Sequence, residues 1–351
     1  MKKVFLAITA ILITISLHAQ NKPGQQTARG DYRFMFYNCE NFFDTEDDPA
    51  KRDDEFTPEG MKHWTPRRYQ EKLSHIAKVI TAVGGWEPPE IVGLCEVENR
   101  SVLDDLTRKS PLKVFGYKII HYESPDSRGI DVALLYIPQK FKPIKSRPIP
   151  VVFPEGMGKK TRDILYVEGV LTKCNDTIHI FVNHWPSRWG GQMETDPKRI
   201  FVAQLLRTKV DSILQQNPRA NIFIMGDLND FPTDRSLLEG LRAKHTYDNP
   251  QPTELYNLSY YLQETKGEFS HRHQGEGGIL DQMIVSGNML DRKGKIYTDK
   301  DFAHIYKSEF LLEKDPNYPG YKPFRTYIGY KYHGGFSDHL PPYIDIFCNK
   351  N

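Results

Sequence analysis

The sequence predicts an α/β domain of about 320 residues, in which short strands alternate with helices. Apolar runs of strand length alternate along the chain with stretches whose apolar residues recur at helical spacing. Most of the apolar runs lack a regular polar residue at every second position, which is typical of strands covered on both faces of a sheet. The chain has no internal repeat and no low-complexity linker, so we expect a single domain over residues 31–349.

Two long helices are expected. In the first, Thr65 is a favoured capping residue, Pro66 suits the first helical position, and Gly84-Gly85 ends the pattern. The second is predicted to open at Asp196-Pro197 and to end at Asn217-Pro218. Each carries apolar residues at helical spacing on one face, as expected for helices packed on a sheet.

The predicted strands follow the apolar runs. They cover residues 32–37, 91–97, 117–122, 130–137, 164–172, 178–183, 221–225, 279–286 and 342–347. Residues 288–333 differ, because they are rich in Tyr, Phe, Lys and Arg and contain three prolines. We expect a long irregular excursion there. Its aromatic and basic residues suit stacking on nucleic-acid bases, or equally the packing of a long loop.

The first 19 residues have the layout of a secretory signal peptide. Lys2 and Lys3 precede an apolar run over residues 4–17, and Ala19 offers a cleavage site before Gln20. The alternative is an uncleaved anchor, but the run is shorter than the roughly 20 residues of a spanning helix. We therefore expect export to a periplasmic or extracellular location, without stable membrane insertion after processing. Residues 20–30 are polar and are expected to form a flexible lead-in.

Charge and cysteine content set further limits. Without residues 1–19, Lys+Arg falls from 47 to 45 against 45 Asp+Glu, so the processed chain is formally neutral. Only local basic patches can therefore support binding to nucleic acid. Cys39 and Cys95 lie in apolar runs and suit core positions, whereas Cys174 and Cys348 can pair if their strands lie close.

Polar residues that suit metal binding or proton transfer occur at the ends of several apolar strands. Carboxylate and amide oxygens suit a hard cation, and histidine supplies proton transfer or charge at a phosphate. Each has a structural alternative: the Gly-Asp-Leu-Asn-Asp segment suits an Asx turn, and the strand-end histidine suits a core position. The residues are Asn38, Glu96, His184, Asp227, Asn229, Asp281, Asp338 and His339.

The order of these residues is more specific than any one of them. Asn, Leu-x-Glu, a strand-end His, Gly-Asp-x-Asn, a strand Asp and Ser-Asp-His follow one another from about residue 32 to residue 347. This order resembles the endonuclease/exonuclease/phosphatase superfamily, and the phrase Asn-His-Trp-Pro-Ser-Arg is similar to an exported bacterial branch. The resemblance implies a four-layered α/β sandwich, with two mixed β-sheets packed face to face and flanking helices. Its site would lie at one rim of the sheets.

The resemblance also implies roles on the metal side of the site. Asn38 and Glu96 resemble metal ligands, with Asp338 close to the same ion. The cation implied is Mg²⁺, with Mn²⁺ or Ca²⁺ as alternatives. Asp227 resembles the group that orients the attacking water, and Asn229 the group that holds the phosphate or that aspartate.

The histidines have implied roles as well. His339 resembles the histidine that contacts the scissile phosphate, with Asp281 fixing its tautomer. His184 resembles the histidine that protonates the leaving oxygen in deoxyribonuclease-like members. Arg128 or Arg188 would supply charge to the phosphate. Glu98 departs from the pattern, because deoxyribonuclease-like members can carry Arg there, so their DNA contacts do not transfer directly.

These residues predict an exported, metal-dependent phosphodiesterase, with a nuclease acting on nucleic acid as the first choice. A phosphohydrolase of the same fold acting on lipid head groups or small phosphodiesters is the first alternative. A calcineurin-like phosphoesterase is disfavoured, because its early Asp-x-His and its Gly-Asn-His-Glu/Asp strings do not occur. An inactive binding module would be expected to have lost site residues, yet every expected polar group is present.

Overall fold

The computed structural model describes residues 29–349. The expected signal peptide and residues 20–28 of the expected lead-in therefore lie outside the described residues. Arg29, at the end of that lead-in, donates hydrogen bonds to the Gly84 and Pro88 carbonyls and pairs with Glu90 at 2.9 Å. The chain is thus fixed to the domain from Arg29 onward.

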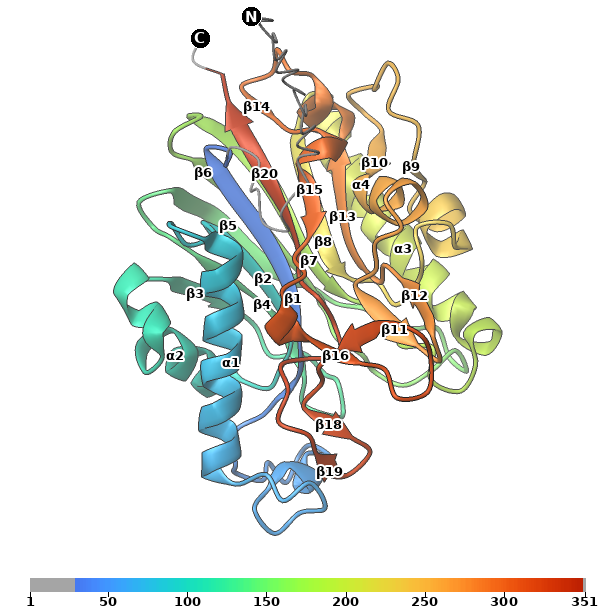
Figure 1. The fold of residues 1–351 in the computed structure, drawn as a ribbon. Helices are drawn as coiled ribbons and strands as arrows, with labels where there is room; N and C mark the ends of the chain where they lie inside the picture. Colours follow the sequence, from blue (N-terminus) through green and yellow to red (C-terminus); the bar gives the residue numbers. More distant parts are fainter. Residues whose placement is uncertain (1–28, 350–351) are drawn as a thin grey trace, which may run out of the picture.

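Two mixed seven-stranded sheets form the centre of the molecule (Figure 1). The first has the order β14-β20-β1-β2-β4-β3, with β15 also paired to β20, and the second has the order β5-β6-β7-β8-β13-β10-β9. Strands of the first sheet are β1 (Tyr32–Phe42), β2 (Ile91–Val97), β3 (Lys118–His121), β4 (Asp131–Tyr136), β14 (Ile296–Tyr297), β15 (Ala303–Ile305) and β20 (Pro342–Cys348). Strands of the second are β5 (Phe141–Ile149), β6 (Ile164–Leu171), β7 (Asp176–His184), β8 (Asn221–Asp227), β9 (Ala243–Lys244), β10 (Leu255–Asn257) and β13 (Asp281–Ser286).

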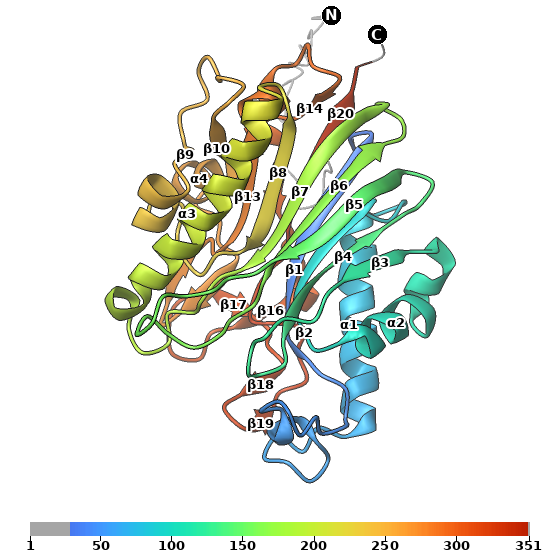
Figure 2. The ribbon, with the colours of Figure 1, turned by 180° about the vertical axis from the view of Figure 1, so that it is seen from behind.

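Helices cover the outer faces of both sheets. Figure 1 and the reverse view in Figure 2 show α1 (Pro66–Gly84) and α2 (Arg100–Arg108) on the first sheet, and α3 (Gln192–Gln216) on the second. The short α4 (Leu258–Tyr260) follows β10. Three small hairpins lie outside the sheets: β11 (His271–His273) with β12 (Glu276–Gly278), β16 (Leu312–Lys314) with β17 (Tyr321–Pro323), and β18 (Tyr327–Ile328) with β19 (Lys331–Tyr332).

The two sheets pack directly against each other. The Phe34 and Phe223 rings, one from each sheet, meet edge to face with centroids 5.2 Å apart. A Cβ at Gly93 would lie 2.7 Å from the Met225 methyl group, so a larger residue at this position would have to displace the end of the Met225 side chain. The main core fills the space between the sheets, and a second core lies between the second sheet and α3. The four-layered α/β sandwich is thereby confirmed.

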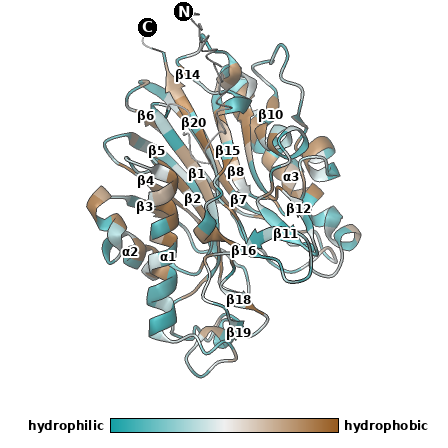
Figure 3. Cartoon of the chain, viewed as in Figure 1, coloured by the Kyte–Doolittle hydropathy of each residue, from teal (hydrophilic) through white to brown (hydrophobic). Residues whose placement is uncertain are grey.

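The distribution of hydropathy explains this packing. Figure 3 shows hydrophobic residues along the central strands of both sheets and hydrophilic residues on β11 and β12. Burying one Leu, Ile or Phe side chain stabilises the fold by about 1.5–3 kcal/mol. Strands buried on both faces therefore gain most from lying inside a sandwich.

The second long helix begins earlier than predicted. It starts at Gln192, so Pro197 lies inside it rather than at its start. An interior proline removes one helical hydrogen bond and costs about 3 kcal/mol. The buried Arg199 offsets this cost, because it donates to the Gln192 carbonyl and the Thr195 hydroxyl and pairs with Asp230 at 2.7 Å.

Strand β5 and helix α2 are among the elements that were not predicted. Strand β5 contains Pro143 and Pro148, which depress strand signals, but β5 lies at the edge of its sheet, where missing N–H donors are tolerated. Helix α2 begins after Asn99, whose side chain accepts a hydrogen bond from Val102 N at 3.1 Å. The excursion over residues 288–333 is less irregular than expected, because it contributes β14 and β15 to the first sheet.

The cysteine predictions are confirmed. A disulfide joins Cys174, in the turn between β6 and β7, to Cys348 at the end of β20, so it links the two sheets. Cys39 and Cys95 are free and buried. Among the helices of residues 29–349, none is long and apolar enough to span a membrane.

Candidate active site

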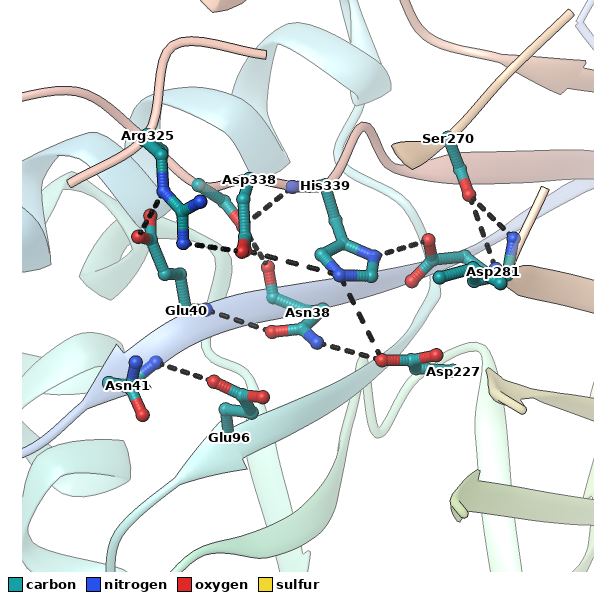
Figure 4. A network of polar contacts seen from close by, with 12 residues as sticks. Asn38, Glu40, Asn41, Glu96, Asp227, Ser270, Asp281, Arg325, Asp338 and His339 are labelled. Atoms are coloured by element: carbon teal, nitrogen blue, oxygen red, sulfur yellow. Dashed lines mark hydrogen bonds and ion pairs between the residues drawn. The ribbon is translucent and has the colours of Figure 1, made fainter. Parts of the chain in front are cut away.

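Strand register brings the polar residues together at one rim of the sandwich. In the second sheet, Asp227 at the end of β8 is paired with His184 of β7 on one side and Asp281 of β13 on the other. In the first sheet, Asn38 of β1 is paired with Cys95 of β2, directly before Glu96. Figure 4 shows the Asn38 side chain extending toward Asp227, so the two sheets meet at this point.

Local backbone features aim these side chains. Glu96 has φ of 56°, at an irregularity in the pairing of β2 with its neighbours, so it leaves the strand direction. Asn229 also has a positive φ, of 51°. Gly226 is required for a different reason, because a Cβ there would lie 2.3 Å from the Asn183 carbonyl oxygen. The glycine of Gly-Asp-x-Asn therefore lets β8 approach β7.

Asp227 is the centre of the site. Its Oδ2 accepts a hydrogen bond from Asn38 Nδ2 at 3.0 Å, and its Oδ1 accepts one from Asn229 N at 2.9 Å. Oδ2 also lies 3.7 Å from His184 Nε2 and 3.9 Å from His339 Nε2. Burial, together with the nearby charge of Asp281, raises the pKa of Asp227 to about 7. A carboxyl group with this pKa can accept a proton near neutral pH.

His339 has a dedicated partner. Its Nδ1 donates to Asp281 Oδ2 at 2.6 Å, which leaves Nε2 facing Asp227. Burial opposes a charge on the ring, but the carboxylates of Asp281 and Asp227 outweigh it and raise the pKa of His339 well above its usual value. His339 is therefore a cation at neutral pH.

His184 has the opposite electrostatic character. It is 4% exposed, and its Nε2 lies 3.8 Å from Glu96 Oε1. Burial first, and then the positive charges of Arg162 and Arg128, lower the pKa of His184 well below its usual value. Two histidines thus face one carboxylate, one neutral and one charged, and such divergence is typical of sites that divide acid and base roles.

The metal-ligand candidates offer an oxygen-rich environment. Within residues 29–349, Glu96 accepts one hydrogen bond, from Asn41 N at 2.9 Å, and no Lys or Arg nitrogen is paired with it. Asn38 Oδ1 accepts from Glu40 N and keeps a second lone pair. The candidate ligands are carboxylate and amide oxygens, and Glu96 is not paired with a Lys or Arg side chain within the described residues. Such a set of oxygens suits a hard divalent ion such as Mg²⁺.

Asp338 lies beside this group. Its Oδ2 accepts from Arg325 Nη2 at 2.9 Å, and its Oδ1 lies 4.0 Å from His339 Nε2. Burial opposes ionisation, but the charges of Arg325 and His339 lower the pKa of Asp338 to about 2. Asp338 is therefore an anion at any physiological pH.

The two arginine candidates differ in their surroundings. Arg128 is paired with Asp126 at 3.6 Å and half-exposed, and its charge acts on His184. Arg188 instead donates to the Asn229 carbonyl at 2.7 Å and pairs with Asp234 at 2.6 Å. The Arg188 guanidinium thus braces the Gly-Asp-Leu-Asn-Asp loop, whereas the half-exposed Arg128 is paired only with Asp126 among the residues that the structure describes.

Asn229 is held by the neighbouring loop. Its Nδ2 donates to the Trp185 carbonyl at 3.0 Å, and the same carbonyl accepts from Arg162 Nη2 at 2.6 Å. Asn229 N binds Asp227 Oδ1, so its backbone holds that aspartate in place. One of the two predicted roles of Asn229 was to hold Asp227, and this backbone hydrogen bond is consistent with that role.

Sequence reasoning missed several charged residues at the site. Arg325 bridges Glu40 and Asp338, and the buried Lys72 donates to the Thr326 hydroxyl and the Phe336 carbonyl. Arg162 donates a hydrogen bond to the carbonyl of Trp185, the residue that follows His184. Glu40 could have been identified as a site residue from the sequence, because it lies two residues after Asn38 on the same strand. The cations had no local signal, since they come from α1 and from long connections.

Several aromatic residues of the excursion pack against cations of the same chain. Lys62 lies 4.9 Å from the Tyr327 ring centroid and 5.1 Å from that of Tyr330, and Arg68 lies 4.4 Å from that of Tyr332. Tyr327 is buried, whereas Tyr321 and Tyr330 are exposed. Packing therefore accounts for part of this composition, and the exposed rings of Tyr318, Tyr321 and Tyr330 remain for contacts outside the domain.

The chain is similar to known proteins in both sequence and fold. A sequence model described as the endonuclease/exonuclease/phosphatase family matches residues 33–348, which is nearly the whole described chain. The chain belongs to this family. None of the curated proteins compared with the chain matches it.

Solved structures share the fold at low sequence identity. A humanized D. rerio TDP2 carrying 14 mutations is 13% identical, with a TM-score of 0.54 over 91% of this chain and 99% of that one. The human nocturnin catalytic domain with a bound sulfate anion is 18% identical, with a TM-score of 0.53 over 91% and 94%. A Bacteroides thetaiotaomicron endonuclease/exonuclease/phosphatase family protein is 14% identical, with a TM-score of 0.54 over 90% and 95%.

Proposed function

We propose that the chain is an exported, divalent-metal-dependent phosphodiesterase, and that nucleic acid is its substrate class. The observation that carries the proposal is the arrangement around Asp227, whose Oδ2 lies within 4 Å of the Nε2 atoms of both His184 and His339. One carboxylate that accepts a proton near pH 7, one neutral histidine and one charged histidine suit the hydrolysis of a phosphodiester.

Each group has a role in this chemistry. Asp227 orients the attacking water and accepts its proton, because its pKa is raised to about 7. His339 holds positive charge against the scissile phosphate, and Asp281 keeps its Nε2 turned toward that phosphate. Arg128 adds charge beside His184. Asn38, Glu96 and Asp338 would hold the cation, which when bound polarises the phosphate and offsets its negative charge.

His184 has the more specific role. Because His184 is neutral before the reaction, the proton that it would pass to the leaving oxygen is one that its Nε2 first takes up from Asp227, whose Oδ2 lies 3.7 Å away. The sulfate in the nocturnin domain supports a phosphate-like anion site on this fold, because sulfate resembles phosphate in shape and charge.

Export has two supports. Residues 1–19 have the pattern of a signal peptide, and the disulfide between Cys174 and Cys348 suits an oxidising compartment. Mass spectrometry of the protein from its native host should give an N-terminus near Gln20. An intact Met1 in a membrane fraction would contradict export.

A lipid or small-phosphodiester hydrolase is the second candidate, favoured by the neutral charge of the processed chain. The exposed rings of Tyr321 and Tyr330 favour nucleic acid, since exposed aromatic residues can stack on bases. The experiment is to incubate the purified chain with plasmid DNA, RNA, bis-p-nitrophenyl phosphate and inositol phospholipids, with and without Mg²⁺. Cleavage of DNA or RNA and not of phospholipid is the expected result.

Glu96→Gln tests the metal side of the proposal. The variant should need much more Mg²⁺ for half-maximal hydrolysis, because it replaces a charged ligand by a neutral one. Glu98→Gln is the matched control, since Glu98 lies two residues further and accepts from Asp44 N rather than facing the site. Full hydrolysis in EDTA, or unchanged Mg²⁺ dependence in Glu96→Gln, would overturn the assignment.

A further inference from the structure

The hairpin of β11 and β12 carries a histidine to the edge of the active site. His271 forms a backbone bridge with His339, and the two rings have centroids 4.8 Å apart. The residue before His271 is held in place, because Leu340 N donates to the Ser270 carbonyl at 2.7 Å and Ser270 Oγ accepts from Asp281 N at 3.2 Å, and His271 itself is paired with Gly278 of β12. The position of His271 is therefore set by backbone contacts.

His271 has none of the contacts that usually account for a half-buried histidine. Within the described part of the chain, its ring nitrogens make no hydrogen bond and no ion pair. One of its ring nitrogens, a carboxylate oxygen of Asp338 and a ring nitrogen of His339 all lie within 4.8 Å of one another. Three groups that can bind a metal thus converge, and one of them lacks another partner.

The second histidine is oriented as a metal ligand would be. His339 Nδ1 is held by Asp281 at 2.6 Å, so the nitrogen turned toward Asp338 is Nε2, at 4.0 Å from Oδ1. A ligating histidine usually donates its other N–H to a carboxylate, which fixes its tautomer and raises its basicity. Asp281 supplies this contact.

The donor set differs from the one around Asn38 and Glu96. Two imidazole nitrogens and one carboxylate suit borderline ions such as Zn²⁺ and Co²⁺, whereas Mg²⁺ prefers oxygen ligands. We propose that His271, Asp338 and His339 form a second metal site, which binds a transition metal such as Zn²⁺ and shares Asp338 with the proposed Mg²⁺ site. Zinc–nitrogen bonds of about 2.0–2.1 Å require the three side chains to move closer together on binding.

Occupation of this site has a consequence for hydrolysis. A metal on His339 Nε2 displaces the proton of that nitrogen and so removes the charge and the donor that face the phosphate, and a metal on Asp338 withdraws a carboxylate from the Mg²⁺ site. Zn²⁺ is therefore expected to inhibit hydrolysis in the presence of Mg²⁺. This inhibition rests on the proposed function, but metal binding by the three residues does not.

The test uses Co²⁺ as a spectroscopic probe for Zn²⁺. Titration of the full processed chain with Co²⁺ should produce a visible absorption band that Zn²⁺ abolishes by displacement. His271→Phe keeps a ring against His339 but removes the ligand, so its Co²⁺ affinity should fall at least about 10-fold. His273→Phe is the matched control, since His273 lies on the same strand, is exposed and is outside the group of three. It should bind Co²⁺ as the unmodified chain does.

The outcomes separate this site from the proposed function. A Co²⁺ band that is unchanged in His271→Phe, or absent from the unmodified chain, overturns the second site whatever the chain hydrolyses. Glu96→Gln should keep the His271-dependent band while its Mg²⁺ affinity falls, because Glu96 is not among the three ligands. If none of the phosphodiesters is cleaved but the band depends on His271, the proposed function fails and the metal site stands.

Discussion

Asp281 and His339 are joined by a 2.6 Å hydrogen bond between Oδ2 and Nδ1, although they are 58 residues apart and Asp281 begins β13 of the second sheet whereas His339 lies just before β20 of the first. The pairing depends on the packing of β13 against the segment that leads into β20. It also fixes the charge of the histidine, since the pKa of His339 is raised well above its usual value by Asp281 and Asp227 against the effect of burial.

Asp281→Asn tests this relationship. The substitution keeps the shape of the side chain but removes its charge, so the pKa of His339 should fall. Because His339 is expected to act as a cation, the alkaline limb of the pH–kcat profile should move to lower pH, and kcat at pH 8 should fall about 10²-fold or more. A profile of unchanged shape, in a variant of normal melting temperature, would contradict the role given to Asp281.

His184→Ala and His339→Ala should each lower kcat by about 10²-fold or more, with little effect on folding. If both histidines act on one phosphate, the double variant should lose less than the product of the two single losses. Melting temperature and kcat are measured on the same samples. A core role for His184 would give the reverse result, with a lower melting temperature and nearly normal turnover of the folded fraction.

Glu98→Gln should raise stability at alkaline pH. Burial, together with the charges of Asp44 and Asp53, raises the pKa of Glu98 to about 8, so the native state holds a proton that the unfolded state releases near pH 4.5. Stability from this group is present at low pH and is lost as the pH rises from about 4.5 to 8. The variant should therefore exceed the unmodified chain by on the order of 1–3 kcal/mol at pH 8.5 and match it at pH 4.5.

The measurement for Glu98 is urea denaturation at both pH values. Glu59→Gln is the control, because Glu59 is an exposed glutamate in the segment between β1 and α1 and its substitution removes no buried carboxyl group. Equal gains at pH 4.5 and pH 8.5 in Glu98→Gln would show that the pKa of Glu98 is not the cause.

The disulfide between Cys174 and Cys348 should stabilise the sandwich. It closes a loop over a sequence separation of 174 residues and joins the two sheets, so Cys174→Ser with Cys348→Ser should lower the free energy of unfolding by about 2–5 kcal/mol. Denaturation with and without a reductant checks this. The reduced unmodified chain should match the double variant, and the variant should not respond to the reductant.

Much of the fold was determined by local sequence. The start and end of helix α1 were predicted correctly, because both signals are local in the sequence: Thr65 caps the helix and Gly84-Gly85 ends it. The strands ending in Asn38, Glu96 and Asp227 were recognised because each is an apolar run followed by a polar residue. Their side chains meet because the strand ends share one rim, which follows from sheet geometry once the order of strands is known.

Other features depended on contacts between distant residues and had no local signal. The early start of α3 rests on Arg199 reaching Asp230, and the placement of Arg325 rests on Glu40, which is 285 residues away. The partner of Cys174 was open until the turn between β6 and β7 was seen beside the end of β20. Sequence alone predicted which residues form the candidate site. Only the tertiary structure decided which charges surround them, because electrostatic effects depend on distances in space and not on positions along the chain.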